Sequence, residues 1–125
     1  MKRLVVVDDE PDILEVARLS LETMTDWEVR TADSGLPGFE LIRSDPPDAV
    51  LLDFRMPDID GLEVFRRLRE DPATASVPVI FLTASTNRIE REAVFETAAT
   101  GLIEKPFDPM TLAQQVSDML GWGST

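Results

Sequence analysis

Five polar side chains in this sequence end short apolar runs or directly follow them. They are Asp8 and Asp9 after Val5-Val6-Val7, Asp53 after Val50-Leu51-Leu52, Thr83 after Phe81-Leu82, and Lys105 after Leu102-Ile103-Glu104. Three carboxylates held close together would repel one another and raise at least one pKa. A divalent cation relieves that repulsion, and Mg²⁺ suits a site of one or two direct carboxylates completed by water. The aspartates therefore favour a magnesium site.

Asp53 is the candidate nucleophile of this set. A carboxylate can attack phosphorus and form an aspartyl phosphate when the charge of the transferring group is neutralised. Mg²⁺ held by Asp9 and Asp53 would neutralise part of that charge. The Lys105 ammonium would hold another phosphoryl oxygen, and the Thr83 hydroxyl could donate to a third.

Each of these residues also has an ordinary structural interpretation when taken singly. Asp8 and Asp9 could enter a helix and point at water, Thr83 could cap the following helix, and Lys105 could be a surface lysine before a proline turn. The chain has only one other lysine, Lys2, and otherwise uses arginine, which favours a need for a compact ammonium at position 105. The combination of all five residues favours chemistry.

Two absent residue types exclude several classes of protein. The sequence has no Cys, which excludes disulfides, cysteine-based zinc sites and thiol nucleophiles. It also has no His, which excludes Ser-His-Asp hydrolases, a phosphohistidine on this chain and the usual transition-metal sites. Any chemistry must therefore use carboxylates, hydroxyls, Lys, Arg and a hard metal ion.

Length and charge indicate a single globular domain. The chain has 125 residues and a net charge of −12, which argues against direct binding to nucleic acid or to anionic membranes. No apolar run approaches the roughly 20 residues that span a bilayer, and no secretory signal follows Met1. We expect a cytoplasmic protein.

The apolar runs predict the strands that must position these residues. A continuous run of branched apolar residues is typical of a strand buried on both faces, as in a parallel sheet covered by helices. Ligands of such sheets bind beyond the carboxyl ends of the strands, where all five polar residues would lie. The predicted strands are 3–8, 27–32 (a half-exposed edge strand), 49–53, 77–83 and 102–103.

The spacing of apolar residues predicts a helix after each of these strands. The first predicted helix begins at Pro11 and runs to about residue 24, the second follows a cap at Asp33 or Ser34, and the third follows the capping pair Asp60 and Glu63 and ends near Asp71. The fourth begins at Ser85 or Thr86, faces Ile89, Ala93 and Val94 inward and ends at Gly101. Asp108 and Pro109 open the last helix.

Alternating strands and helices indicate an α/β fold with a doubly wound parallel sheet. We expect one domain over residues 1–121, with residues 122–125 forming a tail or the start of a linker.

Four sequence pieces, in order, resemble the receiver domain of two-component response regulators, the CheY-like receiver family. They are Val6 to Pro11 around Asp8-Asp9, Leu51 to Gly61 around Asp53, Phe81 to Ala84 around Thr83, and Lys105-Pro106-Phe107. The resemblance implies a flavodoxin-like (CheY-like) five-stranded sheet in the order 2-1-3-4-5 with helices on both faces.

The resemblance also implies a role for each site residue. Asp53 would be the phosphoacceptor, Asp9 a direct Mg²⁺ ligand and Asp8 a ligand mainly through water, while the backbone carbonyl of Arg55 would complete the coordination. Thr83 would move toward the phosphoryl group and Lys105 would pair with it. The Lys105–Pro106 peptide bond would be cis.

The implied partners are a phosphodonor and an output element. A sensor histidine kinase or a histidine phosphotransfer protein would supply the phosphoryl group, and a surface around the fourth helix, fifth strand and fifth helix would switch a downstream protein or domain. The same surface could support a homodimer. Family members often carry Tyr or Phe at the position of Leu102, so aromatic signalling from Thr83 is open here.

Two other functions remain to be weighed. The first is a receiver-like scaffold that interacts without phosphorylation, which the leucine at position 102 favours. The second is a phosphohydrolase with an aspartyl-phosphate intermediate. Such enzymes usually need a second Asp two residues after the nucleophile, where this chain has Arg55, and they carry a cap domain for which there is no room. We therefore expect a signalling switch and no enzyme of external substrates.

Overall fold

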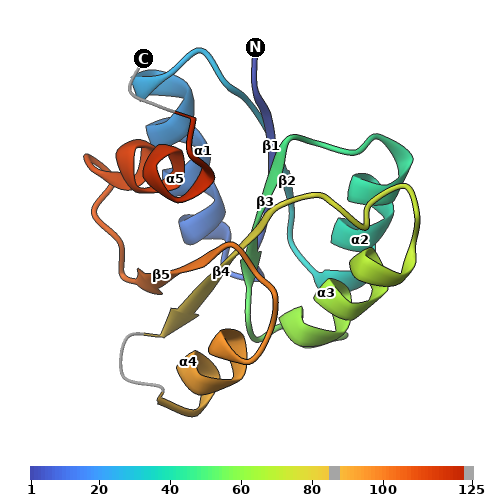
Figure 1. The fold of residues 1–125 in the computed structure, drawn as a ribbon. Helices are drawn as coiled ribbons and strands as arrows, with labels where there is room; N and C mark the ends of the chain where they lie inside the picture. The colour runs from blue at the N-terminus through green and yellow to red at the C-terminus, as the bar shows by residue number, and fades with distance from the viewer. Residues whose placement is uncertain (85–87, 123–125) are drawn as a thin grey trace.

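A five-stranded parallel sheet forms the centre of the molecule in the computed structural model, which describes residues 1–84 and 88–122 (Figure 1). The strand order is β2-β1-β3-β4-β5. The strands are β1 (Arg3–Val7), β2 (Glu28–Ala32), β3 (Ala49–Asp53), β4 (Val79–Ala84) and β5 (Gly101–Lys105). The predicted doubly wound fold and its strand order are confirmed.

Five helices cover the two faces of the sheet in the described part of the chain. They are α1 (Pro11–Met24), α2 (Gly35–Ser44), α3 (Gly61–Glu70), α4 (Arg88–Phe95) and α5 (Leu112–Leu120). Helices α1 and α5 pack on one face, and α2, α3 and α4 lie on the other (Figure 1). The molecule therefore has three layers, with a core on each side of the sheet.

Successive residues of the central strands point into opposite cores. Leu4 and Val6 of β1 belong to the core under α1 and α5, whereas Val5 and Val7 belong to the core under α2, α3 and α4. All four are fully buried. Because both faces are covered, the strand tolerates no polar position, which explains the unbroken apolar run in the sequence.

Strand register brings the polar residues to one edge of the sheet. Val7 pairs with Leu52, so Asp8 leaves β1 next to the end of β3. Asp53 pairs with Leu82, and Ala84 pairs with Lys105. In a parallel sheet these carboxyl ends lie side by side, so residues almost 100 positions apart in the chain become neighbours.

Several predicted element ends are confirmed. Pro11 occupies the first turn of α1, where its missing amide hydrogen costs nothing. The Asp60 carboxylate caps α3 by accepting from the backbone N–H of Glu63. Strand β2 lies at the edge of the sheet and is only partly buried, as its alternating sequence predicted.

The prediction for the fourth helix was wrong in its end and in one residue of its inward face, whereas Ala93 and Val94 do face the core as predicted. Helix α4 ends at Phe95, six residues before Gly101, which instead begins β5. Ile89 is 77% exposed, while Glu90 and Val94 are buried. The apolar pattern could not predict that Glu90 faces inward, because a buried glutamate is stabilised by a partner from another segment. The predicted start at Ser85 or Thr86 lies outside the described residues.

Two caps also differ from the sequence prediction. Helix α5 begins at Leu112, and the Asp108 carboxylate caps a turn before it by accepting from the N–H of Met110. Ser34 precedes α2 but makes no side-chain cap. The Asp58 carboxylate, from the loop after β3, accepts from the N–H groups of Gly35 and Leu36 instead. A long-range partner has replaced the local cap.

The end of the described chain packs onto the domain. The ring of Trp122, which was expected to start a tail, lies 5.1 Å from that of Trp27, edge to face, with the Lys2 ammonium 4.9 Å from its centroid. The rest of that predicted tail, residues 123–125, lies outside the described residues.

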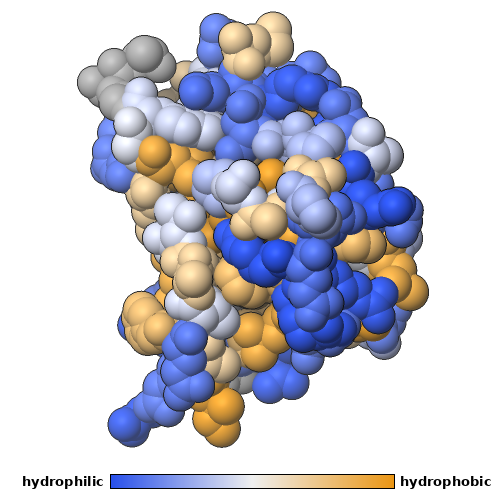
Figure 2. Space-filling model, turned by 45° about the vertical axis from the view of Figure 1, so that its right-hand side comes forward, coloured by the Kyte–Doolittle hydropathy of each residue, from blue (hydrophilic) through white to orange (hydrophobic). Residues whose placement is uncertain are grey.

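Hydrophilic residues cover much of the face in Figure 2, with hydrophobic patches between them. Within the described residues, no helix has the length and apolar character needed to cross a bilayer.

Candidate functional site

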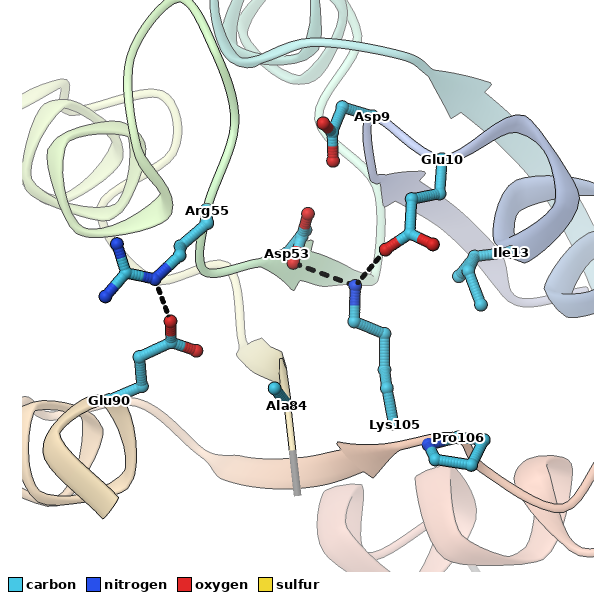
Figure 3. Close-up of a pocket in the computed structure, with 9 residues that line it drawn as sticks. All are labelled: Asp9, Glu10, Ile13, Asp53, Arg55, Ala84, Glu90, Lys105 and Pro106. Carbon is cyan, nitrogen blue, oxygen red and sulfur yellow. Dashed lines mark hydrogen bonds and ion pairs between the residues drawn. The ribbon is translucent and has the colours of Figure 1, made fainter. Parts of the chain in front are cut away.

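The side chain of Lys105 joins the carboxylates at the edge of the sheet. Its Nζ lies 3.1 Å from Asp8 Oδ2 and 3.1 Å from Asp53 Oδ1. It also lies 3.3 Å from Glu10 Oε1 (Figure 3). The structure therefore brings Asp8, Asp53 and Lys105 together as the sequence predicted, and it adds Glu10, which sequence reasoning did not select.

The local chain directions explain why these side chains meet. Asp8 follows β1 directly, and its Oδ1 accepts from the backbone N–H of Glu10, which turns the chain toward α1. Lys105 ends β5, and the Lys105–Pro106 peptide bond is cis, as the resemblance implied. An extended strand end places each side chain at the rim of the sheet instead of in the core.

The loop after Asp53 is held at both of its ends. The N–H of Gly61 donates to the carbonyl of Phe54, and a Cβ at position 61 would lie 2.3 Å from the Asp53 carbonyl oxygen. Only glycine fits this close approach. Asp58 ties the middle of the loop to α2. The backbone around Arg55 is therefore fixed by contacts on two sides.

Burial sets the protonation behaviour of the two central carboxylates. The side chains of Asp8 and Asp53 are 0% and 5% exposed. Burial raises the pKa of Asp8, against the opposing effects of the Glu10 amide and Lys105. Burial and then the charge of Asp8 raise the pKa of Asp53 to about 7. Two carboxylates that share one cation thus hold a proton more readily than free aspartate.

The ammonium responds in the opposite direction. Burial lowers the pKa of Lys105, but the charges of Asp8 and Asp53 and their hydrogen bonds outweigh burial, so its pKa is raised. Lys105 is therefore a fixed positive charge at neutral pH. A fixed cation beside a buried carboxylate is suited to bind an oxyanion that becomes attached to that carboxylate.

A cavity of about 490 Å³ opens over these residues and is lined by Asp9, Asp53, Arg55 and Lys105, among others. The carboxylates of Asp8, Asp9 and Glu10 can each offer an oxygen to one ion, since these oxygens lie within 4.8 Å of one another. This acidic group is the kind of oxygen donor set that a hard divalent cation prefers.

Thr83 directly precedes Ala84, which lines the cavity, and its hydroxyl is not bonded to the other site residues. It is 1% exposed, and its Oγ1 has no hydrogen-bond partner among the described residues. An unpaired buried hydroxyl costs free energy, so this donor is available to a group that enters the site. Leu102 is half-buried and packs against the core on the α4 side. It pairs with Phe81, two residues before Thr83.

Sequence reasoning missed an ion pair at the rim of the cavity. The Arg55 side chain donates through Nε to the Glu90 carboxylate, which joins the loop after β3 to the first turn of α4 (Figure 3). Position 90 looks like an ordinary helical glutamate in the sequence. The signal that could have found it is its spacing of four from Val94, which places both residues on the inward face.

Comparison with known proteins agrees with this geometry. The response regulator receiver domain matches residues 4–117. The DNA-binding dual master transcriptional regulator RpaA of Synechocystis is 34% identical over 120 residues, which cover 96% of this chain and 49% of that protein. The chain spans about half of the length of such curated relatives, or less.

Solved structures show the same fold. A putative response regulator from Chloroflexus aurantiacus superposes with a TM-score of 0.88 at 34% identity, over 96% of this chain and 98% of that one. The chemotaxis protein CheY4 of Vibrio cholerae gives 0.86 at 26% identity, over 95% and 98%. The family match, the strand order and the acidic pocket agree. The chain belongs to the response regulator receiver family, whose members are phosphoacceptor signalling domains.

Proposed function

We propose that Asp53 accepts a phosphoryl group from a sensor histidine kinase or a histidine phosphotransfer protein, in a reaction that requires Mg²⁺. The observation that carries this proposal is the position of Lys105, whose Nζ lies 3.1 Å from Asp53 Oδ1 and 3.1 Å from Asp8 Oδ2. A fixed cation at that distance would bind an oxygen of a phosphoryl group placed on Asp53.

The chemical step is a displacement at phosphorus. An Asp53 carboxylate oxygen forms the new O–P bond while the P–N bond to the donor histidine breaks, and the electron pair of that bond stays on the histidine nitrogen. Lys105 exchanges its Asp53 contact for a phosphoryl oxygen, and the Thr83 hydroxyl donates to another. Both groups stabilise charge on the transferring group, which is the main contribution a protein can make to this reaction.

Asp8, Asp9, the Asp53 carboxylate and the Arg55 backbone carbonyl would hold the Mg²⁺. The residues present fit such an ion, because the Asp8, Asp9 and Glu10 carboxylates cluster at the site. Asp8, Glu10 and Asp53 share the Lys105 ammonium, so negative charge is in excess there. When bound, the ion supplies positive charge that keeps Asp53 ionised and offsets the charge of the incoming phosphoryl group.

Phosphorylation then biases a surface made of α4, β5 and α5. The modification replaces the single negative charge of the Asp53 carboxylate with the roughly two negative charges of a phosphoryl group, and would draw Thr83 toward them. Leu102, which pairs with Phe81, would repack in place of an aromatic ring. This face would bind a downstream output protein or domain, or a second copy of the chain. The receiver would occupy residues 1–121.

The same residues argue against an enzyme acting on external phosphate esters. Arg55 occupies the position where aspartyl-phosphate hydrolases need a second Asp, and an arginine cannot exchange protons at neutral pH. The activity proposed is limited to self-catalysed phosphorylation and dephosphorylation. A cytoplasmic location is proposed because a histidine kinase takes its phosphoryl group from ATP.

Intact-protein mass spectrometry tests the proposal. The protein is incubated with phosphoramidate and Mg²⁺, and a mass gain of one phosphoryl group is expected. The gain should disappear in Asp53→Asn and when the metal is chelated. The matched control is Asp118→Asn, an exposed aspartate of α5 that should label normally. Undiminished labelling of Asp53→Asn would contradict the proposal. Equal partner affinity with and without phosphorylation would favour the phosphorylation-independent scaffold.

A further inference from the structure

The Arg55–Glu90 ion pair combines an exposed arginine with a buried carboxylate. The side chain of Arg55 is 70% exposed, whereas that of Glu90 is 3% exposed. Arg55 lies two residues after Asp53, and both Arg55 and Glu90 line the cavity that contains Asp53 and Lys105. In Figure 3 the Arg55 guanidinium lies on the side of Asp53 away from Lys105. The cavity thus has one cation on each side of the proposed phosphoacceptor.

The two cations differ in how firmly they are held. Lys105 is 13% exposed and contacts three carboxylates, so its position is fixed. Arg55 reaches Glu90 from a largely exposed side chain, and its guanidinium has donors in addition to the Nε used in that contact. A planar guanidinium fits a phosphoryl group better than it fits a single carboxylate oxygen, because it can donate two parallel hydrogen bonds.

We propose that Arg55 is a phosphoryl-binding residue that exchanges partners: it leaves Glu90 and binds the phosphoryl group when Asp53 is modified. This inference rests on the proposed function of Asp53 as the phosphoacceptor. Glu90 is a positioning residue in this scheme, since it holds Arg55 beside the site until the stronger anion arrives. No covalent bond changes in the exchange.

The exchange makes Glu90 a competitor of the phosphoryl group. Every hydrogen bond that Arg55 makes to Glu90 must be given up before the guanidinium can bind the new anion. Weakening the Glu90 carboxylate should therefore strengthen phosphoryl binding, and removing the guanidinium should weaken it. A pair with a purely structural role predicts something different, because either substitution breaks the same contact and both should act in one direction.

The exchange would also connect the site to α4. Glu90 lies in the first turn of this helix, so phosphorylation would remove the tie between α4 and the loop after β3. This route is separate from the Thr83 and Leu102 route along β4 and β5. It gives a chain without an aromatic residue at position 102 a second way to alter the α4 surface.

The test measures binding of beryllofluoride, a stable mimic of the phosphoryl group, in the presence of Mg²⁺ by ¹⁹F NMR. Arg55→Gln should weaken binding by about fivefold, and Glu90→Gln should strengthen it by about threefold. These modest changes are expected because binding replaces one charge-assisted hydrogen bond of Arg55 with another. Arg55→Lys should restore part of the affinity. In the double variant, Glu90→Gln should have almost no effect.

The double variant separates partner exchange from a general field effect. If Glu90→Gln strengthened binding equally with and without Arg55, its charge alone would be responsible and the proposal would be overturned. The same holds if both single variants shifted the affinity in one direction or left it unchanged. Arg91→Gln is the matched control, because it breaks another α4 ion pair, 2.7 Å long, to Glu104, which does not line this cavity.

A direct spectroscopic readout accompanies the affinities. The Arg55 Nε–H signal, assigned by its loss in Arg55→Lys, should shift when beryllofluoride binds, while the signal of Arg91 should not. Failure of the unsubstituted protein to bind beryllofluoride would contradict the proposed function as well. Normal binding with an unchanged Arg55 signal would overturn only the partner exchange.

Discussion

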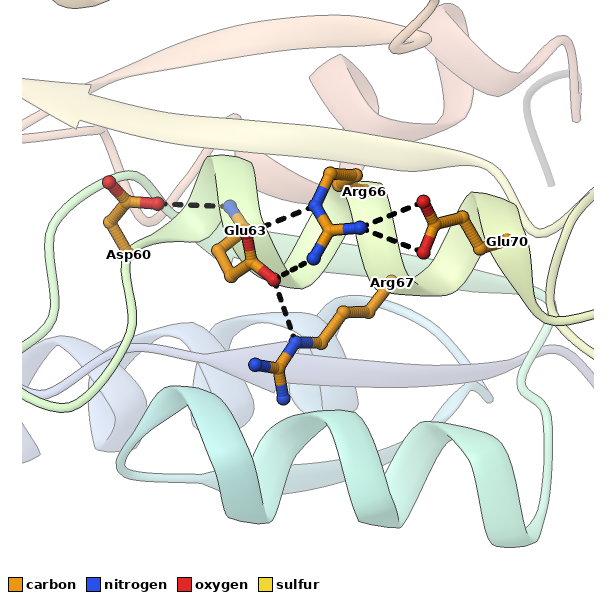
Figure 4. Close-up of polar contacts among 5 residues, drawn as sticks. All are labelled: Asp60, Glu63, Arg66, Arg67 and Glu70. Atoms are coloured by element: carbon orange, nitrogen blue, oxygen red, sulfur yellow. Dashed lines mark hydrogen bonds and ion pairs between the residues drawn. The ribbon is translucent and has the colours of Figure 1, made fainter.

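Two charge clusters of this protein both pair carboxylates with basic side chains, but the carboxylate pKa is raised in one and lowered in the other. At the sheet edge, the ammonium of Lys105 is shared among buried carboxylates. On the outer face of α3, Glu63 accepts from Arg66 and Arg67, and Arg66 also donates to Glu70 (Figure 4). Burial and Asp8 raise the pKa of Asp53 to about 7, whereas Arg66 and Arg67 lower the pKa of Glu63 to about 2.

The difference shows what each cluster contributes. On α3 two arginines contact Glu63 and one of them also contacts Glu70, so each carboxylate has a cation. The group lies at the surface in contact with water, so the helix gains only modest local stability. At the sheet edge the carboxylates outnumber the single ammonium and are removed from water. The negative charge there is not fully compensated, so the site favours binding of a metal ion and is suited to phosphoryl transfer.

Removal of Lys105 should produce the largest effect. Lys105→Met leaves the Asp8 and Asp53 carboxylates buried without their cation, and we expect the free energy of unfolding to fall by about 3 kcal/mol at pH 8 without divalent ions. Urea denaturation measures this loss, and added Mg²⁺ should recover part of it. The matched control is Lys2→Met, which should lose less than about 1 kcal/mol with its contact to Trp122. Equal losses in both variants would contradict the assignment of Lys105 as the cation that stabilises the buried carboxylates.

The second prediction concerns metal affinity. Asp9→Asn removes one oxygen ligand of the acidic group, and we expect the affinity for Mg²⁺ to fall by at least about tenfold, since even the partners of metal ligands are worth that much. Isothermal titration calorimetry measures the affinity. Glu63→Gln, in the exposed cluster, should bind Mg²⁺ like the unsubstituted protein. A similar affinity for all three proteins would show that the sheet edge is not the metal site.

The third prediction compares two buried threonines. The Thr83 hydroxyl lacks a partner, so Thr83→Val should leave stability unchanged or raise it by up to about 1 kcal/mol. The Thr74 hydroxyl donates to the Leu68 carbonyl at 2.7 Å, so Thr74→Val should lose about 1 to 2 kcal/mol. Thermal unfolding measures both. A larger loss for Thr83→Val would mean that its hydroxyl already has a structural partner.

The smallest effect is expected on α3. The pKa of Glu63 lies below that of an unfolded glutamate, so its ion pairs stabilise the helix above about pH 4.5, and this contribution is lost as the pH falls toward about 2. At neutral pH, Glu63→Gln should change stability only slightly, and less at high salt. NMR titration of the Glu63 carboxyl carbon should give a midpoint well below that of a free glutamate. A midpoint near the ordinary value would show that the pairs do not persist in solution.

The fold and the central site were predictable because local pattern determines them. Unbroken apolar runs required strands covered on both faces, and the polar residue after each run had to emerge at one edge of a parallel sheet. Asp8, Asp53 and Lys105 therefore met as predicted. The same logic included Thr83, because it ends the fourth run.

The remaining features depend on contacts between segments far apart in the sequence. Asp58 caps α2 across 23 positions, and no pattern near Ser34 reveals that partner. Glu90 is buried and pairs with Arg55 from another segment, so the apolar pattern placed Ile89 on the inward face of α4 in its place. Glu10 was passed over because an exposed glutamate after two aspartates is ordinary; only the position of Lys105 makes it part of the site.

The most direct test of the account locates the phosphoryl group in the chain. After phosphorylation by a histidine kinase or by phosphoramidate, borohydride reduction converts an aspartyl phosphate into homoserine, and peptide sequencing by mass spectrometry identifies the converted residue. We predict homoserine at position 53 alone, and only when Mg²⁺ was present. Homoserine at another aspartate, or none in a fully phosphorylated sample, would contradict the central role assigned to Asp53.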